Sequence, residues 1–351
     1  MRHIEIGGIV SGEGQLAQLN TFARHQLIEG ATHIQRLDGL ASRAPELLSG
    51  VNVFVKRDDH MALGGGGNKL RKLEFHIGRA LAEGCDTVVT VGGLQSNHAR
   101  LTAAVAAKVG LHCELVLSRI VPRADTDYEN NGNMLLDKLF GARIHVLDGS
   151  QDALTHVQER AQTLRTEGHR VLVIPTGGST GLGALGYVRC AAEVAMQEAE
   201  LGLQFSEVIV PNGSGGTQAG LIAGFATLGR AINVRGFSVL AAREYAQATT
   251  ATLVREACGL LGIDAPPVEV DVDDAQLGPG YGVPTRELID AVQLLARIEG
   301  LMLDPVYSGK AFAGLLADIK AGRHQAGVNV LFVMTGGQPG LYAYPTTFDG
   351  P

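Results

Sequence analysis

The feature that most constrains this chain is a regular alternation of short apolar stretches with stretches of helical periodicity, beginning near residue 68. In the first helical stretch, Leu70, Leu73, Ile77 and Leu81 recur at the spacing of one helix face. Strands that alternate with helices form parallel sheets with helices on both faces. The pattern therefore predicts an α/β fold of two domains, with a ligand cleft between them at the carboxyl ends of the strands.

The expected elements are read from apolar runs, helical spacing and glycine stop signals. Strands are expected at 87–91, 113–117, 143–147, 171–175, 207–211, 234–240 and 330–335. Helices are expected at 70–81, 97–109, 133–140, 152–167, 218–228, 245–261, 286–299 and 310–320.

Composition and charge narrow the function classes. The chain has 351 residues and a net charge of −7 without a long basic run, so a nucleic-acid partner is not expected. Residues 1–15 lack a signal-peptide pattern and no apolar stretch has membrane-spanning length, so we expect a cytoplasmic protein without a membrane partner. The four cysteines lie far apart, which predicts buried free thiols and no metal site.

Four consecutive glycines, at 64–67, precede Asn68 and Lys69 at the start of the first predicted helix. This is not a nucleotide-binding P-loop, because Leu70 follows the lysine where Ser or Thr would bind magnesium. Such a lysine is either a solvated surface charge or an amine that forms a Schiff base with a carbonyl group. The local sequence leaves both readings open.

A second glycine-rich turn, Gly213-Ser214-Gly215-Gly216-Thr217, connects a predicted strand to a predicted helix. Free backbone N–H groups and the positive end of the helix dipole make such a turn an anion site. The spacing does not fit the dinucleotide-binding G-x-G-x-x-G pattern, so a single phosphate or a mononucleotide is favoured over NAD.

A third strand end carries the polar residues Gln95, Ser96, Asn97 and His98. Ser96 or Asn97 is expected to cap the following helix, and three consecutive polar side chains there indicate a carboxylate site. Tyr281, which stands between two glycines, is a further candidate with an accessible hydroxyl group.

Together these segments resemble the D-cysteine desulfhydrase and aminocyclopropane-carboxylate (ACC) deaminase family of pyridoxal-phosphate enzymes. The matching motifs run in the family's order over roughly residues 50–345. They are KRDD at 56–59, GGNKLRKLE at 66–74, QSNHAR at 95–100, NGN at 131–133, GALGY at 183–187, GSGGT at 213–217, YGVP at 281–284 and DPVYSGK at 304–310.

The resemblance implies a two-domain type II pyridoxal-phosphate fold, like that of the tryptophan synthase β chain, assembled as a homodimer. Residues 1–69 and 176–351 would form the large cofactor-binding domain, and residues 70–175 a small inserted α/β domain.

The resemblance also implies roles for individual residues. Lys69 would be the Schiff-base lysine and the general base. Gln95, Ser96, Asn97 and His98 would bind the substrate together with Tyr281, and Ser96 would also take part in catalysis and Asn97 contact the cofactor. Tyr281 and Tyr307 would be active-site tyrosines, Ser308 would face the pyridine nitrogen, and the phosphate would bind Gly213, Ser214, Gly215, Gly216 and Thr217.

The reaction implied is β-elimination from a small amino acid, which gives pyruvate and ammonia. ACC deaminases carry a glutamate at the position of Ser308 and a glutamine at the position of His98. A neutral hydroxyl makes the ring a weaker electron sink, adequate when a good leaving group departs. Both differences favour a carbon–sulfur lyase, D-cysteine desulfhydrase first and L-cysteate sulfo-lyase second. ACC deaminase, a dehydratase or a β-replacement enzyme of the same fold, and a non-enzymatic binder, remain the alternatives.

Overall fold

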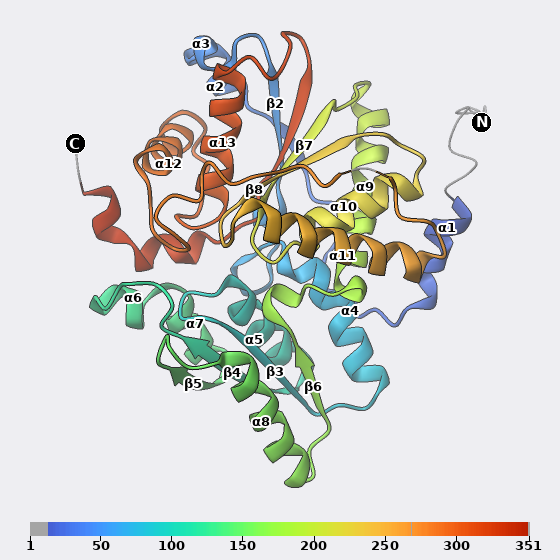
Figure 1. Ribbon diagram of the computed structural model, residues 1–351, viewed down its shortest axis with the longest axis vertical. Helices are drawn as coiled ribbons and strands as arrows, with labels where there is room; N and C mark the ends of the chain where they lie inside the picture. Colours follow the sequence, from blue (N-terminus) through green and yellow to red (C-terminus); the bar gives the residue numbers. More distant parts are fainter. Residues whose placement is uncertain (1–12, 268, 350–351) are drawn as a thin grey trace.

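The computed structural model describes residues 13–267 and 269–349, and it contains two separate β-sheets (Figure 1). Most of residues 1–15, where the signal-peptide pattern is missing, lie outside the described residues. Within the described part of the chain, no helix combines the length and apolar composition that crossing a bilayer requires. The predicted α/β class with mainly parallel sheets is confirmed.

The larger sheet has six strands in the order β1-β2-β10-β7-β8-β9. Only β1 and β2 are antiparallel, and the other neighbours are parallel. The strands are β1 (Ile34–Arg36), β2 (Asn52–Lys56), β7 (Glu207–Asn212), β8 (Asn233–Ser238), β9 (Val272–Asp273) and β10 (Asn329–Val333).

Helices cover both faces of the larger sheet because successive strand side chains point to opposite faces. In β10, Val330 and Phe332 pack into the core under α12 and α13, whereas Leu331 and Val333 pack against α9 and α10. The helices on the first side are α2 (Asp38–Arg43), α3 (Pro45–Leu48), α12 (Arg286–Glu299) and α13 (Ser308–Lys320), and those on the second are α9 (Gly181–Leu201), α10 (Gly216–Thr227) and α11 (Arg243–Leu261).

The smaller sheet has four parallel strands in the order β5-β4-β3-β6, and it lies below the larger sheet in Figure 1. Its strands are β3 (Thr87–Gly93), β4 (His112–Ser118), β5 (Arg143–Leu147) and β6 (Val171–Ile174). Its helices are α5 (Asn97–Val109), α6 (Thr126–Asn130), α7 (Gly132–Leu139) and α8 (Ala153–Thr166), while α4 (Lys69–Ala82) lies between the two sheets and α1 (Glu13–Gln18) near the N-terminus.

All strands of the smaller sheet fall within the segment 70–175 that was predicted to form an inserted domain. Helix α4 packs against α9 of the larger lobe as well as against α5. The exact domain boundaries therefore stay a prediction.

Helix α9, the longest helix in the described residues, was not predicted. It packs among α4, α10 and α11, and its buried residues run around most of its first four turns. A helix that is buried on most sides lacks the one-sided apolar stripe by which a helix is recognised. The antiparallel pair β1–β2 was also missed, because its strands precede the region of regular alternation.

The four cysteines are free thiols, as predicted. Cys113, Cys190 and Cys258 are buried, and Cys85 is half-buried. Burial raises the pKa of the Cys113 and Cys190 thiols, so both remain protonated at neutral pH. They behave as small apolar residues of the core.

Candidate active site

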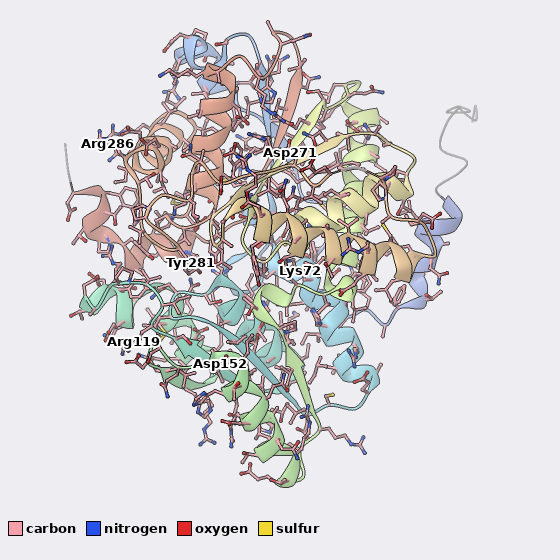
Figure 2. All side chains as sticks on the ribbon, in the orientation of Figure 1. Lys72, Arg119, Asp152, Asp271, Tyr281 and Arg286 are labelled. Carbon is pink, nitrogen blue, oxygen red and sulfur yellow. The ribbon has the colours of Figure 1, made fainter. Side chains whose placement is uncertain are left out.

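A cavity of about 290 Å³ is lined by segments at the carboxyl ends of strands from both sheets. In Figure 2, Tyr281 and Lys72 lie at the level where the two lobes meet, and Asp152 lies below them in the smaller lobe. The predicted site residues that line this cavity are Lys69, Ser96, Asn97, His98, Gly213, Ser214, Gly215, Thr217, Tyr281 and Tyr307. Gln95, Gly216 and Ser308 are the predicted residues that do not.

Lys69 is the first residue of α4, and the glycine loop before it approaches neighbouring backbone closely. At Gly66, whose φ is 73°, a Cβ would lie 2.2 Å from the carbonyl oxygen of Asp59, so only glycine fits. The Lys69 amine donates a hydrogen bond to Asn68 Oδ1 (3.0 Å) and lies 5.9 Å from the ring centroid of Tyr307.

The amine of Lys69 is less basic than an ordinary lysine. Burial lowers its pKa to about 8, and the nearby charge of Arg100 adds to this effect while Asp304 opposes it. A substantial fraction of the amine is therefore neutral at pH 7 to 8, which a nucleophile or a general base requires.

The turn Gly213-Ser214-Gly215 leads from β7 into α10 and lines the cavity, so the N-terminus of α10 borders it; the N–H of Gly216 donates to Ser179 Oγ (3.3 Å). Thr217 accepts a hydrogen bond from Asn68 Nδ2 (3.0 Å), which joins this turn to the Lys69 loop. The hydroxyl groups of Ser214 and Ser179 lie 2.7 Å apart. The turn before α10 thus brings together hydroxyl groups, backbone N–H groups and a helix N-terminus.

Lys72 also faces this turn. Its amine is buried and donates to Ser179 Oγ (2.9 Å) and to the carbonyl oxygen of Gly177 (3.2 Å), and it forms no ion pair with a described residue. A Cβ on Gly216 would lie 2.6 Å from Ser179 Oγ and 2.9 Å from this amine, so a larger residue there would displace both side chains. Burial, and then the charge of Lys69, lower the pKa of Lys72 well below its ordinary value, and a bound anion would supply the missing counter-charge.

The polar turn after β3 also meets the cavity. Ser96 caps α5 by accepting a hydrogen bond from the N–H of Ala99 (3.1 Å), and Asn97 Oδ1 accepts one from Asn133 Nδ2 (2.9 Å). The N-terminus of α5 therefore presents backbone donors and polar side chains to a ligand carboxylate.

His98 is held in its neutral form. Burial lowers its pKa well below the usual value, and the charges of Lys69 and Lys72 act in the same direction. The hydroxyl of Thr90 donates to the carbonyl oxygen of Ile174 (2.7 Å), so His98 must donate from Nε2 to Thr90 Oγ1 (2.8 Å). Its Nδ1 atom is therefore the unprotonated nitrogen.

Gln95 has a supporting position. Its amide group donates to the carbonyl oxygens of Tyr128 (2.6 Å) and Asn131 (3.0 Å), and its Oε1 accepts from the N–H of Asn133 (2.9 Å). Through these three hydrogen bonds the side-chain amide of Gln95 holds the segment 128–133 against the polar turn at residues 95–98. A direct contact of Gln95 with substrate stays a prediction.

Tyr281 and Tyr307 form a pair above Lys69. Their hydroxyl oxygens lie 2.5 Å apart, and their rings meet edge to face with centroids 5.8 Å apart. Burial raises the pKa of both phenols, well above the ordinary value for Tyr281. Both therefore keep their protons at neutral pH and can donate one.

Ser308 is buried at the start of α13. Its hydroxyl donates to Asp304 Oδ1 (2.6 Å) and accepts from the backbone N–H of Asp304 (2.8 Å). The Asp304 carboxylate also accepts from the N–H of Tyr307 (2.9 Å), so this network fixes the backbone that carries Tyr307. The contact of Ser308 with a cofactor ring stays a prediction.

Several lining residues were not identified as site residues from the sequence. They include Asn68, Lys72, Ser118, Ile120, Gln151, Asp152, Leu154, Thr176, Leu240 and Thr335. Lys72 could have been found, because it follows Lys69 by three residues and so lies on the same helix face. Asn68 directly precedes Lys69 in the glycine-rich motif, and most of the others come from separate segments with ordinary local sequence.

Comparison with known proteins defines the class first. The model of the pyridoxal-phosphate-dependent enzyme family matches residues 25–336, and the chain belongs to this family. Its cofactor is therefore pyridoxal phosphate, as predicted.

The particular relatives are D-cysteine desulfhydrases. That of Yersinia enterocolitica is 42% identical over 327 residues, covering 93% of this chain and 97% of the relative, and that of Salmonella choleraesuis is 41% identical over 94% and 98%. A crystal structure of an ACC deaminase homologue matches with a TM-score of 0.86 and 37% identity, over 96% and 98% of the two chains. O-ureido-L-serine synthase, at 18% identity and a TM-score of 0.62, shares the fold.

The residues present fit the cofactor. A lysine of lowered pKa lies beside the polar turn of the smaller lobe, and the glycine-rich turn with Lys72 offers a phosphate N–H donors, hydroxyls and a cation. Lys69 would hold the aldehyde carbon, and Gly213–Thr217 with Lys72 would hold the phosphate.

Proposed function

We propose that this enzyme is a carbon–sulfur lyase that converts D-cysteine and water into pyruvate, ammonia and hydrogen sulfide. The observation that carries the proposal is that the Lys69 amine and the hydrogen-bonded Tyr281–Tyr307 pair line one cavity, with the amine 5.9 Å from the centre of the Tyr307 ring. The 41–42% identity to proteins named D-cysteine desulfhydrase supports the choice of substrate.

The substrate carboxylate binds the N-terminus of α5, where Ser96 and Asn97 present polar groups. Lys69 takes the proton from the substrate Cα, because its lowered pKa leaves part of the amine neutral. Bound pyridoxal phosphate supplies the electron sink for the pair left on Cα. The Tyr281–Tyr307 pair keeps its protons and is placed to donate a hydrogen bond to the departing sulfur.

The test has two arms. Purified holoenzyme is incubated with D-cysteine, L-cysteate and ACC, and keto acid, sulfide and sulfite are measured. D-cysteine is expected to give sulfide and pyruvate in equal amounts. Keto acid from ACC alone would replace the proposal with ACC deamination, to which the match with the ACC deaminase homologue points.

The second arm tests Lys69 directly. Borohydride treatment of the holoenzyme is expected to fix the cofactor on Lys69, as read by mass spectrometry of peptides. Lys69→Ala should abolish both this label and turnover, while Lys108→Ala, at an exposed position on α5, keeps both. A label on another lysine would contradict the proposal. Homodimer formation and a cytoplasmic location stay predictions, and size measurement of the holoenzyme tests the first.

A further inference from the structure

Tyr281 stands between two glycines, and the carbonyl group of each glycine is bound by a buried side chain. The carbonyl oxygen of Gly280 accepts a hydrogen bond from Lys310 Nζ (2.9 Å), and that of Gly282 accepts one from Tyr344 Oη (3.0 Å). Glycine leaves its backbone freer than any other residue does, so two flanking glycines by themselves give Tyr281 no fixed orientation. The two hydrogen bonds restrict that freedom on both sides of the tyrosine.

Gly282 is also packed closely against its neighbours. Its φ is 70°, and a Cβ there would lie 2.5 Å from Val121 Cγ2 and 3.1 Å from Tyr344 Oη. Val121 belongs to the loop after β4 of the smaller lobe, so the loop that carries Tyr281 contacts this lobe on one side and the Tyr344 hydroxyl on another. The place of the Tyr281 loop therefore depends on where Tyr344 is held.

Tyr344 belongs to the C-terminal segment, which runs from the larger sheet onto the smaller lobe. The segment follows β10 and forms two short 3-10 helices, η5 (Gln338–Ala343) and η6 (Pro345–Phe348), on either side of Tyr344. Helix η5 packs against α6 and α7 of the smaller lobe, and in Figure 1 the red C-terminal segment lies beside α6. The Tyr344 side chain is completely buried in the same apolar core as Tyr128 and Met134.

Two side chains of the smaller lobe hold the Tyr344 ring. Tyr128 meets it edge to face with ring centroids 5.5 Å apart, and the guanidinium carbon of Arg123 lies 4.5 Å from its centroid. Both are favourable contacts of an aromatic ring. Arg123 also donates to the hydroxyl groups of Thr346 and Thr347 (3.3 Å each), which fixes the segment after the tyrosine. Burial raises the pKa of the Tyr344 phenol, so its hydroxyl keeps the proton that it donates.

We propose that Tyr344 is a positioning residue, which holds Tyr281 beside Tyr307 through its hydrogen bond to the carbonyl group of Gly282. Tyr344 does not line the cavity, so it acts on the site only through the loop that carries Tyr281. The inference rests on the proposed function for the part that Tyr281 plays at the departing sulfur. It adds that the C-terminal segment, held by the smaller lobe, sets the orientation of that tyrosine.

Tyr344→Phe removes the hydroxyl alone, because it keeps the buried ring and its contacts with Tyr128 and Arg123. With whichever of D-cysteine, L-cysteate and ACC the holoenzyme turns over, this change is expected to lower kcat about tenfold, the effect of one hydrogen bond lost at a buried acceptor. KM should change less, because the groups that bind the substrate carboxylate lie on α5 and are untouched.

A double-mutant cycle separates positioning from a general loss of stability. In the Tyr281→Phe background, Tyr344→Phe should lower kcat no further, because the hydroxyl that Tyr344 positions is already gone. Independent losses that add in the double variant would overturn the inference and leave the proposed function standing. If Tyr281→Phe itself keeps full kcat, the part of Tyr281 in the proposed function fails, and the following measurement alone decides whether Tyr344 positions it.

Fluorine NMR of the holoenzyme gives a readout that does not depend on turnover. Fluorotyrosine is incorporated at the seven tyrosines, and the resonance of Tyr281 is identified as the one lost in Tyr281→Phe. Tyr344→Phe is expected to shift or broaden that resonance, while the remaining resonances show that the variant is folded. The matched control is Tyr342→Phe, because Tyr342 is 53% exposed in η5. An unmoved Tyr281 resonance in Tyr344→Phe, or an equal change in the control, would overturn the inference.

Discussion

Replacing Gly186 with alanine tests how closely α9 must approach the helix that begins with Lys69. A Cβ on Gly186 would lie 2.1 Å from the carbonyl oxygen of Arg71 and 3.0 Å from the backbone nitrogen of Lys72. Both atoms belong to the backbone of α4, so no side chain can rotate away. To restore a separation of 3.0 Å to that oxygen, one helix must move by about 0.9 Å, the difference between 3.0 and 2.1 Å.

Two effects of the substitution oppose each other. Alanine is favoured over glycine in a helix by about 1 kcal/mol. Overpacking a well-packed core costs about 1–3 kcal/mol, and the rigidity of the backbone contact favours the upper end of that range. We therefore expect Gly186→Ala to lower the free energy of unfolding by about 1–2 kcal/mol.

Urea unfolding of the holoenzyme measures this change, and the visible absorbance of the bound cofactor reports any displacement of Lys69. The control is Gly259→Ala in α11, where a Cβ would meet nothing within 4 Å. This variant should gain up to about 1 kcal/mol, because only the helix propensity changes. If Gly186→Ala is as stable as Gly259→Ala, the close approach of α9 to α4 does not limit stability and the reasoning fails.

Two further substitutions probe buried charges near the site. Asp137, whose carboxylate oxygens lack hydrogen-bond partners among the described residues, has its pKa raised to about 8 by burial against the opposing effect of Arg100. Because the pKa of Asp137 is higher in the folded than in the unfolded protein, its contribution to stability is fully present below about pH 4 and is lost as the pH rises through 8. The free energy of unfolding of the wild type should therefore fall from pH 5 to 8. Asp137→Asn removes the titrating group and should flatten that fall. Parallel urea-unfolding profiles for the two proteins would refute this. Lys310 donates to the carbonyl oxygens of Leu277 (2.7 Å) and Gly280 (2.9 Å), directly before Tyr281. Lys310→Met leaves both acceptors unpaired at a cost of about 1–3 kcal/mol, and it should lower kcat more than Lys310→Arg does; equal kcat losses would argue against a role in placing Tyr281.

The sequence by itself determined the fold class and most of its elements. Strand and helix periodicity are local properties, and a helix end is marked by its own residues, so the four strands of the smaller sheet were predicted within one or two residues of their observed bounds, whereas the short helix α6 was missed. The glycine-rich turns were also recognised, because a backbone that must approach an anion or another backbone needs glycine wherever it stands. Lys69 was identified by the motif around it.

Tertiary structure decided those features that require contacts between segments far apart in the chain. The role of α9 as a central helix depends on its burial among α4, α10 and α11, and that burial removes the one-sided apolar pattern from its sequence. Lys72 lies in the same motif as Lys69, but its contact with Ser179 is made only when α4 packs beside the turn after β6. The cavity lining includes residues 120, 154 and 240, which come from three segments with no common local signal. Packing, which brings such residues together and lowers the pKa of Lys69, is a property of the folded chain.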